Sequence, residues 1–486
     1  MVVSIGIDDV LGIHYKTFLE IAVKHIRRGD EVNLITCDKS LKTCPVNPNH
    51  EWGTCIMCKS MLRSGINIEE VSNARQHVLY LNKYRRDIEI PTFSSISELK
   101  NYEIDGVNHG MEAASTVISA LRKPKPNMRE HRDLVERSLF TAVSLYHAAL
   151  EHIDKVDPDC LYVLNGRRAS QMPFVRAAWA KDIDIYTFEV GHNKNKYVLV
   201  EGTYFHDLEN KKREIEEYWN KEDSLKKKKK VAKEFYKKRR YGSGDKFPEA
   251  KFKEGQKKSK LPEGFDPEDR NVAIFNSSED EFAAVRGYEN PVYENQIEGL
   301  KRILEDRSIS KNINFYLRVH PNLEGVKNYQ TKEIKNIDKR NTKVINASSK
   351  VDSYALMEAS DKVLTFGSAM SIESAYYGKP SILIGREPYE DLESCYTPDG
   401  HDEAIRAINN ENLEPKSKLG AIKYGYYIVK RDIKYDVYST DTEKFLGKNL
   451  EASRKSKRIN YYLKNGLKST IYNFLYRRLP SKLKNK

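Results

Sequence analysis

The first 36 residues carry a complete strand–turn–helix–strand signal. The apolar run VVSIGI is typical of a buried strand, and KTFLEIAVKHIRR places its apolar residues at helical spacing before ending on Gly29. EVNLIT follows as a second strand. Parallel strands need a long crossover, normally a helix, so this order predicts the start of a parallel, doubly wound sheet.

The same alternation of strands and helices returns twice along the chain. Residues 133–190 hold two helix patterns and the strands CLYVLNG and IYTFEVG. Beyond Asn271, the strands NVAIFNSS, INFYLRVHP, KVINA, KVLTFGS and PSILIG alternate with helices. A chain of 486 residues exceeds what one core usually organises. We therefore expect an α/β protein with two Rossmann-like domains that present their strand ends to a common cleft.

Composition shifts along the sequence divide the chain into four expected parts. The charged run from Leu208 to Phe247 is helix-forming, and we interpret it as a solvated linker. The four parts are an N-terminal Rossmann-like acceptor domain at 1–205 with a Cys-rich loop at 37–58, a charged helical linker or insertion at 206–269, a C-terminal Rossmann-like domain at 270–415, and a helical return segment with a basic amphipathic tail at 416–486.

Charge and hydropathy exclude several classes of protein. No stretch reaches the roughly 18 apolar residues of a membrane-spanning helix, and the start MVVSIGIDDV lacks the basic region of a signal peptide. We therefore expect a reducing, cytoplasmic location. The net charge is +13, and much of it lies in 451–486, where Glu451 is the only acid. Acids interleaved through the rest of the chain argue against a nucleic-acid partner.

The basic tail has two interpretations. Ile459, Leu463, Leu467 and Ile471 fall near one helical face, with Lys and Arg opposite. Such a helix suits the surface of an anionic membrane, which predicts peripheral contact with the inner face. The alternative is a helix that packs back onto the N-terminal domain.

The segment 363–385, VLTFGSAMSIESAYYGKPSILIG, is the most specific pattern in the chain. A strand runs into Gly367 and Ser368, and a helix begins near Met370 or Ser371. Gly367 lets backbone approach a ligand, and the N–H groups of the helix start suit a phosphate. Glu373, expected on the first helical turn, offers a carboxylate to ribose hydroxyls. The alternative is an ordinary strand–turn–helix, with Ser as cap and Glu as dipole partner.

A second pattern, FYLRVHPN, places Arg318 and His320 where a strand leaves its sheet. Pro321 fixes the exit and therefore holds His320 in place. A cation or donor there suits the phosphate of a leaving group, although a His-Pro can also be a simple turn. Asn276, Ser277 and Ser278 end the domain's first strand and either position the donor or cap the next helix, with Ser278 and Glu281 as a capping box.

The motifs FGSAMSIESAYYGKP and Arg-x-His-Pro together resemble the nucleotide-sugar half of GT-B glycosyltransferases, and in particular the capsule-polysaccharide biosynthesis proteins. The resemblance covers about residues 270–400 and the opening βα unit. It implies a GT-B fold and a donor site formed by Arg318, His320, Gly367, Ser368, Ser371 and Glu373. It also implies a glycan or lipid-linked acceptor and no metal requirement for transfer.

Transfer by direct displacement needs a base, because a sugar hydroxyl is a poor nucleophile until its proton is removed. The candidates follow strands of the N-terminal domain, and we predict Asp9 or His14 for this role beside His320 on the donor. Glu189 and His192, in FEVGHN, are further candidates. Asn165-Gly166-Arg167-Arg168 is a turn whose arginines either hold an acidic acceptor or are simply exposed.

A cysteine cluster follows the second strand. Cys55 and Cys58 have the spacing of a zinc knuckle, and Cys37 and Cys44 complete four thiolates, with His50 as a substitute ligand. A structural Zn would stabilise this loop, and an iron–sulfur cluster needs the same ligands. The alternative is reduced, uncoordinated thiols, with Cys37 in the core.

We expect a glycosyltransferase that moves a sugar from a nucleotide-sugar donor to a glycan or lipid-linked acceptor in surface-polysaccharide biosynthesis. The alternatives are a nucleotide-sugar epimerase or polyol-phosphate transferase on the same fold, and a non-enzymatic, zinc-containing protein that binds polyanions or membranes.

Overall fold

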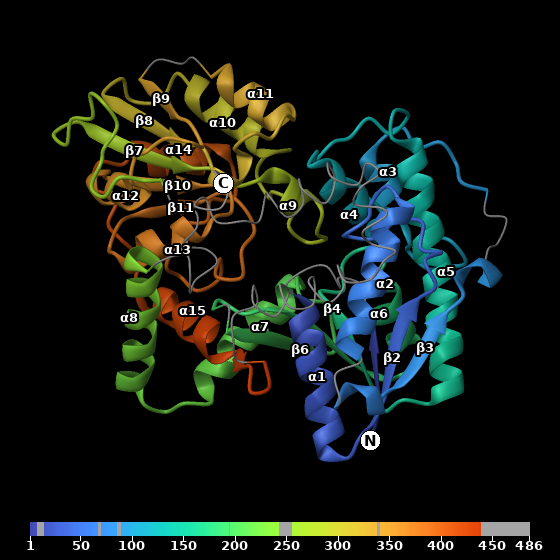
Figure 1. Cartoon of the computed structure of the whole chain (residues 1–486). Helices are drawn as coiled ribbons and strands as arrows, with labels where there is room; N and C mark the ends of the chain where they lie inside the picture. Colours follow the sequence, from blue (N-terminus) through green and yellow to red (C-terminus); the bar gives the residue numbers. More distant parts are fainter. Residues whose placement is uncertain are drawn as a thin grey trace, which may run out of the picture. The chain divides into compact units, whose positions relative to one another are not determined.

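The computed structural model describes residues 1–6, 14–66, 70–84, 89–193, 195–242, 255–337 and 341–438. The chain divides into two compact units, and neither is a single stretch of sequence. The first unit comprises Met1–Pro91, Arg132–Val190 and Lys434–Lys486, and the second comprises Thr92–His131 and Gly191–Ile433. Figure 1 labels most of the helices and strands of both units.

The first unit contains a parallel sheet in the order β5-β4-β1-β2-β3. Its strands are β1 (Val2–Gly6), β2 (Glu31–Cys37), β3 (Arg75–Leu79), β4 (Cys160–Leu164) and β5 (Asp184–Val190). Val3 pairs with Val32 on one side and with Cys160 on the other. The predicted strands VVSIGI, EVNLIT, CLYVLNG and IYTFEVG are therefore confirmed as β1, β2, β4 and β5.

Helices connect these strands as the periodicity predicts. They are α1 (His14–Arg28), α2 (Trp52–Ile66), α5 (Arg132–Val156) and α6 (Met172–Ala180), with the short turns η1 (Val71–Asn73) and η2 (Leu81–Tyr84). Helix α1 buries Phe18, Leu19 and Val23 and ends before Gly29, whose φ of +84° suits a residue without a side chain. The Cys-rich loop is shorter than expected, because α2 already begins at Trp52.

The chain returns to the first unit after its long excursion through the second. The Glu20 carboxylate of α1 is fully buried and accepts hydrogen bonds from the backbone N–H groups of Asp436, Val437 and Tyr438. Tyr435 adds a hydroxyl contact of 2.6 Å to Thr17. Residues 435–438 therefore contact α1, while the return of the tail helix that the sequence suggests at 459–474 stays a prediction. The basic tail at 451–486 lies outside the described residues.

The second unit contains a second parallel sheet, in the order β11-β10-β7-β8-β9. Its strands are β7 (Arg270–Phe275), β8 (Ile313–Arg318), β9 (Thr342–Ile345), β10 (Lys362–Thr365) and β11 (Ser381–Leu383). The short strands β6 (Lys196–Glu201) and β12 (Asp432–Lys434) lie at the two ends of the unit's longer chain segment. All five strands expected after Asn271 are present.

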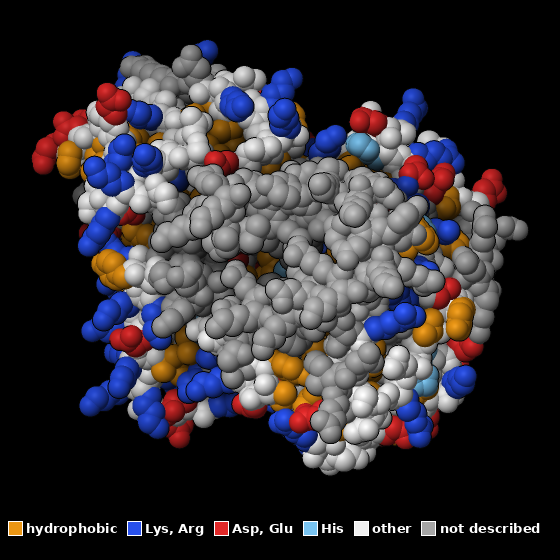
Figure 2. All heavy atoms as spheres, viewed as in Figure 1, with side chains coloured by type: hydrophobic (Ala, Val, Ile, Leu, Met, Phe, Trp, Pro, Cys, Tyr) orange, Lys and Arg blue, Asp and Glu red, His pale blue; other side chains and the backbone are white. Residues whose placement is uncertain are grey.

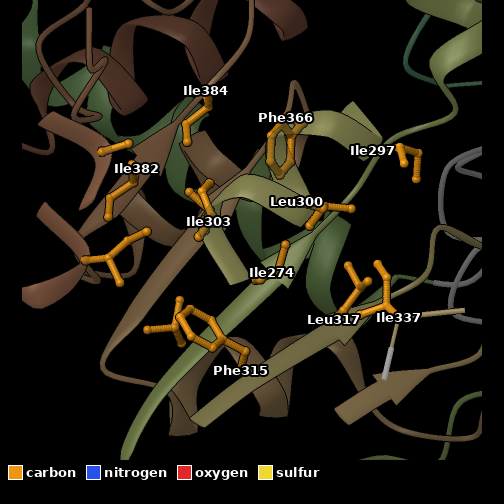
Figure 3. Packing of buried hydrophobic residues seen from close by; sticks show 14 of the residues in the cluster. Ile274, Ile297, Leu300, Ile303, Phe315, Leu317, Ile337, Phe366, Ile382 and Ile384 are labelled. Atoms are coloured by element: carbon orange, nitrogen blue, oxygen red, sulfur yellow. The ribbon is translucent and has the colours of Figure 1, made fainter. Parts of the chain in front are cut away.

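Helices pack on both faces of this second sheet. On one face, Ile297 and Leu300 of α10 pack against Leu317 of β8 and Phe366 (Figure 3). On the other, Leu356 and Met357 of α12 pack against strand residues such as Ala273. The described helices of the whole second unit are α3 (Ile96–Lys100), α4 (Gly110–Leu121), α7 (Leu208–Asn220), α8 (Leu225–Tyr241), α9 (Glu279–Ala283), α10 (Gln296–Glu305), η4 (Pro321–Leu323), α11 (Tyr329–Lys335), α12 (Ser353–Ala359), α13 (Ala369–Tyr376), α14 (His401–Asn409) and α15 (Leu419–Lys430).

The charged segment expected as a solvated linker is instead part of a core. Ile215 of α7 and Phe235 and Tyr236 of α8 are buried against Ile372 of α13 and Tyr427 of α15. The few apolar residues among the Lys and Glu fall on one face of each helix, and that face is enough to dock it. The other face of α8 is basic and exposed, and Figure 2 shows Lys and Arg side chains in that region.

The boundaries of the units also differ from the predicted domains. Residues 92–131, which precede a predicted strand of the first domain, belong to the second unit. Arg122 explains the attachment, because its guanidinium bonds Ser278 at 2.8 Å and pairs with Asp280. Asn328 adds a hydrogen bond to the Arg122 carbonyl.

Candidate functional site

A cavity of about 530 Å³ opens at the carboxyl ends of strands in the second unit. The residues that follow β7, β8 and β10 line it, and α8 supplies another wall. Every lining residue belongs to the second unit. Open parallel sheets bind ligands at this edge, where loops and helix starts gather. Five of the predicted donor-site residues line this one cavity: Arg318, His320, Gly367, Ser368 and Glu373.

The start of α13 forms one wall of the cavity. Gly367 has a φ of +92°, and a Cβ atom there would lie 2.7 Å from the Phe282 ring. Ser368 is the N-cap, with its hydroxyl 3.4 Å from the backbone nitrogen of Met370. The helix therefore begins at Ala369, slightly earlier than expected, and Ala369 and Met370 both line the cavity. A helix start with its positive dipole end at a cavity is suited to an anion.

Glu373 lies on the second turn of α13 rather than on the first. Its carboxylate is buried, and it accepts a hydrogen bond from Arg239 Nε at 2.7 Å and another from the Tyr354 hydroxyl. Burial alone would lower the pKa of Arg239, but the Glu373 charge raises it above its ordinary value. Burial and the same carboxylate raise the pKa of Tyr354. Arg239 Nη2 is also 2.7 Å from Oε1, and because a carboxylate has about four acceptor positions, these three contacts leave one for a ligand.

Two hydrogen bonds, each between a backbone N–H and a side chain, hold His320 in place. Its backbone N–H donates to Asn276 Oδ1 at 3.0 Å, and its ring Nδ1 accepts from the backbone N–H of Asn322 at 3.1 Å. Because Nδ1 is an acceptor here, the proton of the neutral ring lies on Nε2. Pro321 begins the short turn η4, as expected for a fixed exit from the strand. His320 is therefore a positioned hydrogen-bond donor on the cavity.

Arg318 lines the cavity and also bonds the backbone of a neighbouring segment. It is buried, and its guanidinium donates to the carbonyls of Asn346 and Ser349 and to the Ser353 hydroxyl. Burial lowers its pKa to about 10. These bonds connect Arg318 to the segment that follows β9, and Ser353 of this segment also lines the cavity. Ser371, the remaining predicted donor residue, lies away from the lining, where its hydroxyl is 2.9 Å from that of Ser381.

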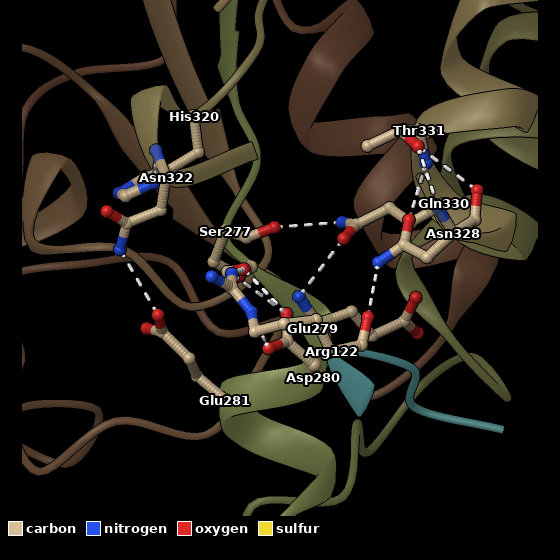
Figure 4. Close-up of polar contacts among 11 residues, drawn as sticks. Arg122, Ser277, Glu279, Asp280, Glu281, His320, Asn322, Asn328, Gln330 and Thr331 are labelled. Carbon is tan, nitrogen blue, oxygen red and sulfur yellow. Dashed lines mark hydrogen bonds and ion pairs between the residues drawn. The ribbon is translucent and has the colours of Figure 1, made fainter. Parts of the chain in front are cut away.

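The polar residues after β7 form a network around the first turn of α9 (Figure 4). Ser277 Oγ accepts from Gln296 Nε2 at 2.6 Å, and its carbonyl accepts from Gln330 Nε2 at 2.8 Å. The predicted capping box is wrong, because the Ser278 hydroxyl bonds Asp280 and makes no cap bond. Glu281 accepts from Asn322 instead, at 3.1 Å. The network fixes the turn that carries Asn276, the partner of His320.

The charged groups of the cavity are of both signs. Lysines and Arg239 are present beside Glu234, Glu281 and Glu387. Burial raises the pKa of Glu387 to about 8, although Lys211 opposes the shift. Near neutral pH this carboxyl is therefore less ionised than an ordinary glutamate, which lowers the negative charge that an anionic ligand would meet.

A second histidine lines the same cavity. His192 Nδ1 lies 2.5 Å from Asp432 Oδ2, and the Asp432 side chain is fully buried. His192 is among the candidates at strand ends in the sequence, but Asp432 is 240 positions away in a segment without a recognisable motif. No local pattern connects the two residues, so the pair cannot be predicted from the sequence.

The predicted acceptor base belongs to the first unit. His14 is the first residue of α1, and its Nδ1 lies 3.1 Å from Glu189 Oε1. Asn165 Nδ2 donates to the other oxygen of Glu189 at 2.7 Å. The structure thus groups two of the strand-end candidates, His14 and Glu189, with Asn165. Asp9 lies outside the described residues.

The structure does not assemble the predicted metal-ligand set. Within the described ranges, no group of three or more His, Cys, Asp or Glu is placed to hold a metal ion. Cys55 and Cys58 lie in α2, and Cys55 Sγ accepts from Asn47 Nδ2 at 3.2 Å. Burial raises the pKa of the Cys37 thiol, which favours the neutral form. Metal binding by Cys37, Cys44, Cys55 and Cys58 stays a prediction.

A helix that crosses a membrane needs about 18 or more predominantly apolar residues. Among the described residues, none of the helices is both long and apolar enough for that role.

Comparisons with known proteins gave structural matches alone. No protein-family model and no curated protein matches the sequence. Thermosulfurimonas dismutans KpsC, beta Kdo 2,7 transferase, is 14% identical with a TM-score of 0.39, over 63% of this chain and 89% of that one. The beta Kdo 2,4 transferase of the same KpsC is 13% identical with a TM-score of 0.30, over 55% and 87%. Methanocaldococcus jannaschii UDP-GlcNAc 2-epimerase is 13% identical with a TM-score of 0.33, over 88% and 99%.

Proposed function

We propose that this protein is a glycosyltransferase that moves a sugar from a nucleotide-sugar donor to a glycan or lipid-linked acceptor in surface-polysaccharide biosynthesis. The observation that carries the proposal is that the start of α13 and His320 line one cavity. Gly367 and His320 come from separate βα units, so their meeting depends on the fold rather than on neighbouring sequence.

The phosphates of the donor would take the hydrogen-bond donors of this cavity. Ala369 and Met370 are in the first turn of α13, and His320 offers Nε2–H. When the glycosidic bond to the nucleotide breaks, negative charge develops on the leaving phosphate. Donors that are already in place stabilise that charge without reorganisation. In this proposal, helix dipole and cationic side chains neutralise the phosphate, and transfer requires no divalent metal.

The nucleoside would lie beside Glu373 and Gly367. The carboxylate of Glu373 accepts hydrogen bonds, and the hydroxyls of a ribose donate them. Gly367 allows close approach, since it carries no side chain and has positive φ. A cavity of about 530 Å³ is within the size range of ligand sites. Arg318 would support the site indirectly, through the loop that it bonds.

The proposal is tested first by binding. Thermal unfolding would be followed with CMP, UDP, GDP and CDP and their sugar conjugates, and at least one is expected to raise the melting temperature. A ligand at about 100 times its Kd stabilises a protein by about 2.7 kcal/mol. His320→Ala should remove most of this shift. His401→Ala is the matched control, because that histidine bonds Asp306 in the same unit and is not in the cavity lining.

The second test is the reaction itself. A transferase releases nucleotide in proportion to the acceptor that is glycosylated, whereas an epimerase rearranges the sugar and a polyol-phosphate transferase moves a phosphate-linked group. Nucleotide shifts that are equal in wild type and His320→Ala would contradict the proposed site. Turnover without a glycosylated product would contradict the transferase assignment.

A further inference from the structure

His192 makes two hydrogen bonds to one carboxylate oxygen of Asp432. His192 Nδ1 is 2.5 Å from Asp432 Oδ2, and the backbone N–H of His192 donates to the same oxygen at 3.1 Å. The residue before it is Gly191, where a Cβ atom would lie 2.6 Å from that oxygen. The carboxylate therefore contacts backbone and side chain together, and only a glycine fits beside it.

The hydrogen bonds of the two cavity histidines give them opposite chemistry. An ionised carboxylate only accepts, so His192 donates Nδ1–H to Asp432, and the lone pair of the neutral ring is on Nε2. In His320 the backbone N–H of Asn322 donates to Nδ1, so Nε2 carries the proton. One cavity thus holds an imidazole that donates from Nε2 and another that accepts there. A reaction in which negative charge develops on a phosphate and a hydroxyl loses its proton needs a hydrogen-bond donor for the first event and a base for the second.

Pairing with a carboxylate does not by itself mark a functional histidine in this unit. His109 bonds Glu112 at 3.0 Å, and His401 bonds Asp306 at 2.9 Å. Neither histidine is in the cavity lining. His192 is distinguished because it combines a fully buried partner with a position on the cavity that also holds His320.

We propose that His192 is the general base of the reaction and that Asp432 positions it. The inference deepens the proposed function and rests on it. Nε2 of His192 takes the proton of an acceptor hydroxyl as that oxygen bonds the anomeric carbon of the donor sugar. The bond from this carbon to the phosphate oxygen breaks, and its electron pair leaves with the nucleotide. Asp432 fixes the tautomer and balances the imidazolium that forms.

The test separates proton transfer from binding. Wild type, His192→Gln and Asp432→Asn would be compared with the nucleotide sugar that stabilises the protein and an acceptor that it glycosylates. His192→Gln keeps a donor toward Asp432 but has no basic nitrogen. Its kcat should fall by about 10²–10⁴-fold, the usual contribution of a general base, while the nucleotide-induced shift stays the same. Asp432→Asn should lower kcat in the same way, with KM for the donor little changed.

Imidazole rescue distinguishes a base from a structural residue. His192→Ala should regain part of its turnover in added imidazole, and the double variant His192→Ala/Asp432→Asn provides a form without an unpaired buried carboxylate if the single variant fails to fold. His401→Ala is the matched control and should transfer normally.

Each contrary result has a distinct meaning. If wild type transfers no sugar, the proposed function fails and this inference fails with it. If wild type transfers and His192→Gln does so at a similar rate, the inference alone is overturned. Loss of nucleotide binding in His192→Gln, lost turnover without imidazole rescue, or an imidazole-rescued loss in His14→Ala in place of His192→Ala would overturn it as well.

Discussion

Arg239 of α8 donates a hydrogen bond from Nε to Oε1 of Glu373 on α13 over 2.7 Å, and the carboxylate is almost completely buried. The bond joins α8, which the sequence suggests is a solvated linker, to Glu373, the expected ligand of a ribose. Glu373 consequently stabilises the packing of α8 on α13 and also lines the cavity. Its substitution cannot be interpreted as loss of a ligand contact alone.

Breaking this ion pair should destabilise the protein. Glu373→Ala and Arg239→Ala are each expected to lower the free energy of unfolding by about 3 kcal/mol, because either leaves a buried charge without its partner. The double variant should cost less than the sum of the two. Urea unfolding of the four proteins measures the coupling.

The neighbouring pair Arg240–Glu358 is the matched control, since Glu358 is 40% exposed. Arg240→Ala should cost at most about 1 kcal/mol through its ion pair. Additive effects of Arg239→Ala and Glu373→Ala would show that the two side chains are not coupled.

Gly367→Ala should damage both stability and nucleotide binding. A positive φ costs a non-glycine residue about 1–3 kcal/mol, and the added Cβ would also lie 2.7 Å from the Phe282 ring. Gly287→Ala isolates the backbone cost, because its φ is +86° and nothing lies within 4 Å of the added atom. Equal losses of stability in the two variants would contradict the steric contact at the cavity.

Nucleotide affinity should fall as the pH rises through the titration of Glu387. Burial raises the pKa of this carboxyl to about 8, so ionisation above that value adds a negative charge to the cavity. Burial also lowers the pKa of Lys211 to about 7, so the nearby positive charge is lost over the same interval. A nucleoside diphosphate should bind about tenfold more weakly at high pH, a difference of about 1.4 kcal/mol.

Calorimetric titrations on both sides of this pH range measure the effect. Glu387→Gln should bind the nucleotide with a smaller dependence on pH than wild type. Glu411→Gln alters a carboxyl that is 67% exposed and outside the lining, and it should behave as wild type. A pH dependence that Glu387→Gln leaves intact would assign the effect to other groups.

Acid should destabilise the first unit partly through His152. Burial, followed by the charges of His77 and Lys155, lowers the pKa of this histidine from 6.5 to about 4. The unfolded chain binds the proton more readily, so the contribution of His152 is complete above about pH 6.5 and is lost as the pH falls to about 4. The loss amounts to about 3 kcal/mol.

His152→Gln should reduce this acid dependence, even if the loss of the 2.9 Å contact with Ser4 lowers stability at neutral pH. Unfolding by urea at a series of pH values would compare the variant with wild type. Parallel stability curves for the two proteins would mean that protonation of other groups accounts for the acid effect.

The parts of the fold that sequence predicts are those with local periodicity. Apolar alternation and helical spacing locate β1, α1, β10 and α13, because each signal lies within one element. The cavity residues Gly367 and His320 were also predictable, since each follows a strand and carries an unusual neighbour, a serine cap or a proline. Parallel strand ends meet at one edge, so local patterns sufficed to bring them together.

The rest depends on contacts between distant residues. No sequence pattern around Glu373 predicts its contact with Arg239, and none around His192 predicts its contact with Asp432. Helix α8 looked solvated because charged residues outnumber its apolar ones, although Phe235 and Tyr236 are enough to bury one face. The charge of Arg318 is visible in the sequence, whereas the distant carbonyls that it bonds are not.

The polypeptide passes from one compact unit to the other four times, at 91/92, 131/132, 190/191 and 433/434. A protein built from two consecutive modules can be cut once and its halves exchanged with those of a relative. Here a single cut always leaves at least one unit without a segment of its own. Changing the ligand preference of this chain therefore calls for grafting of individual loops rather than for recombination of halves.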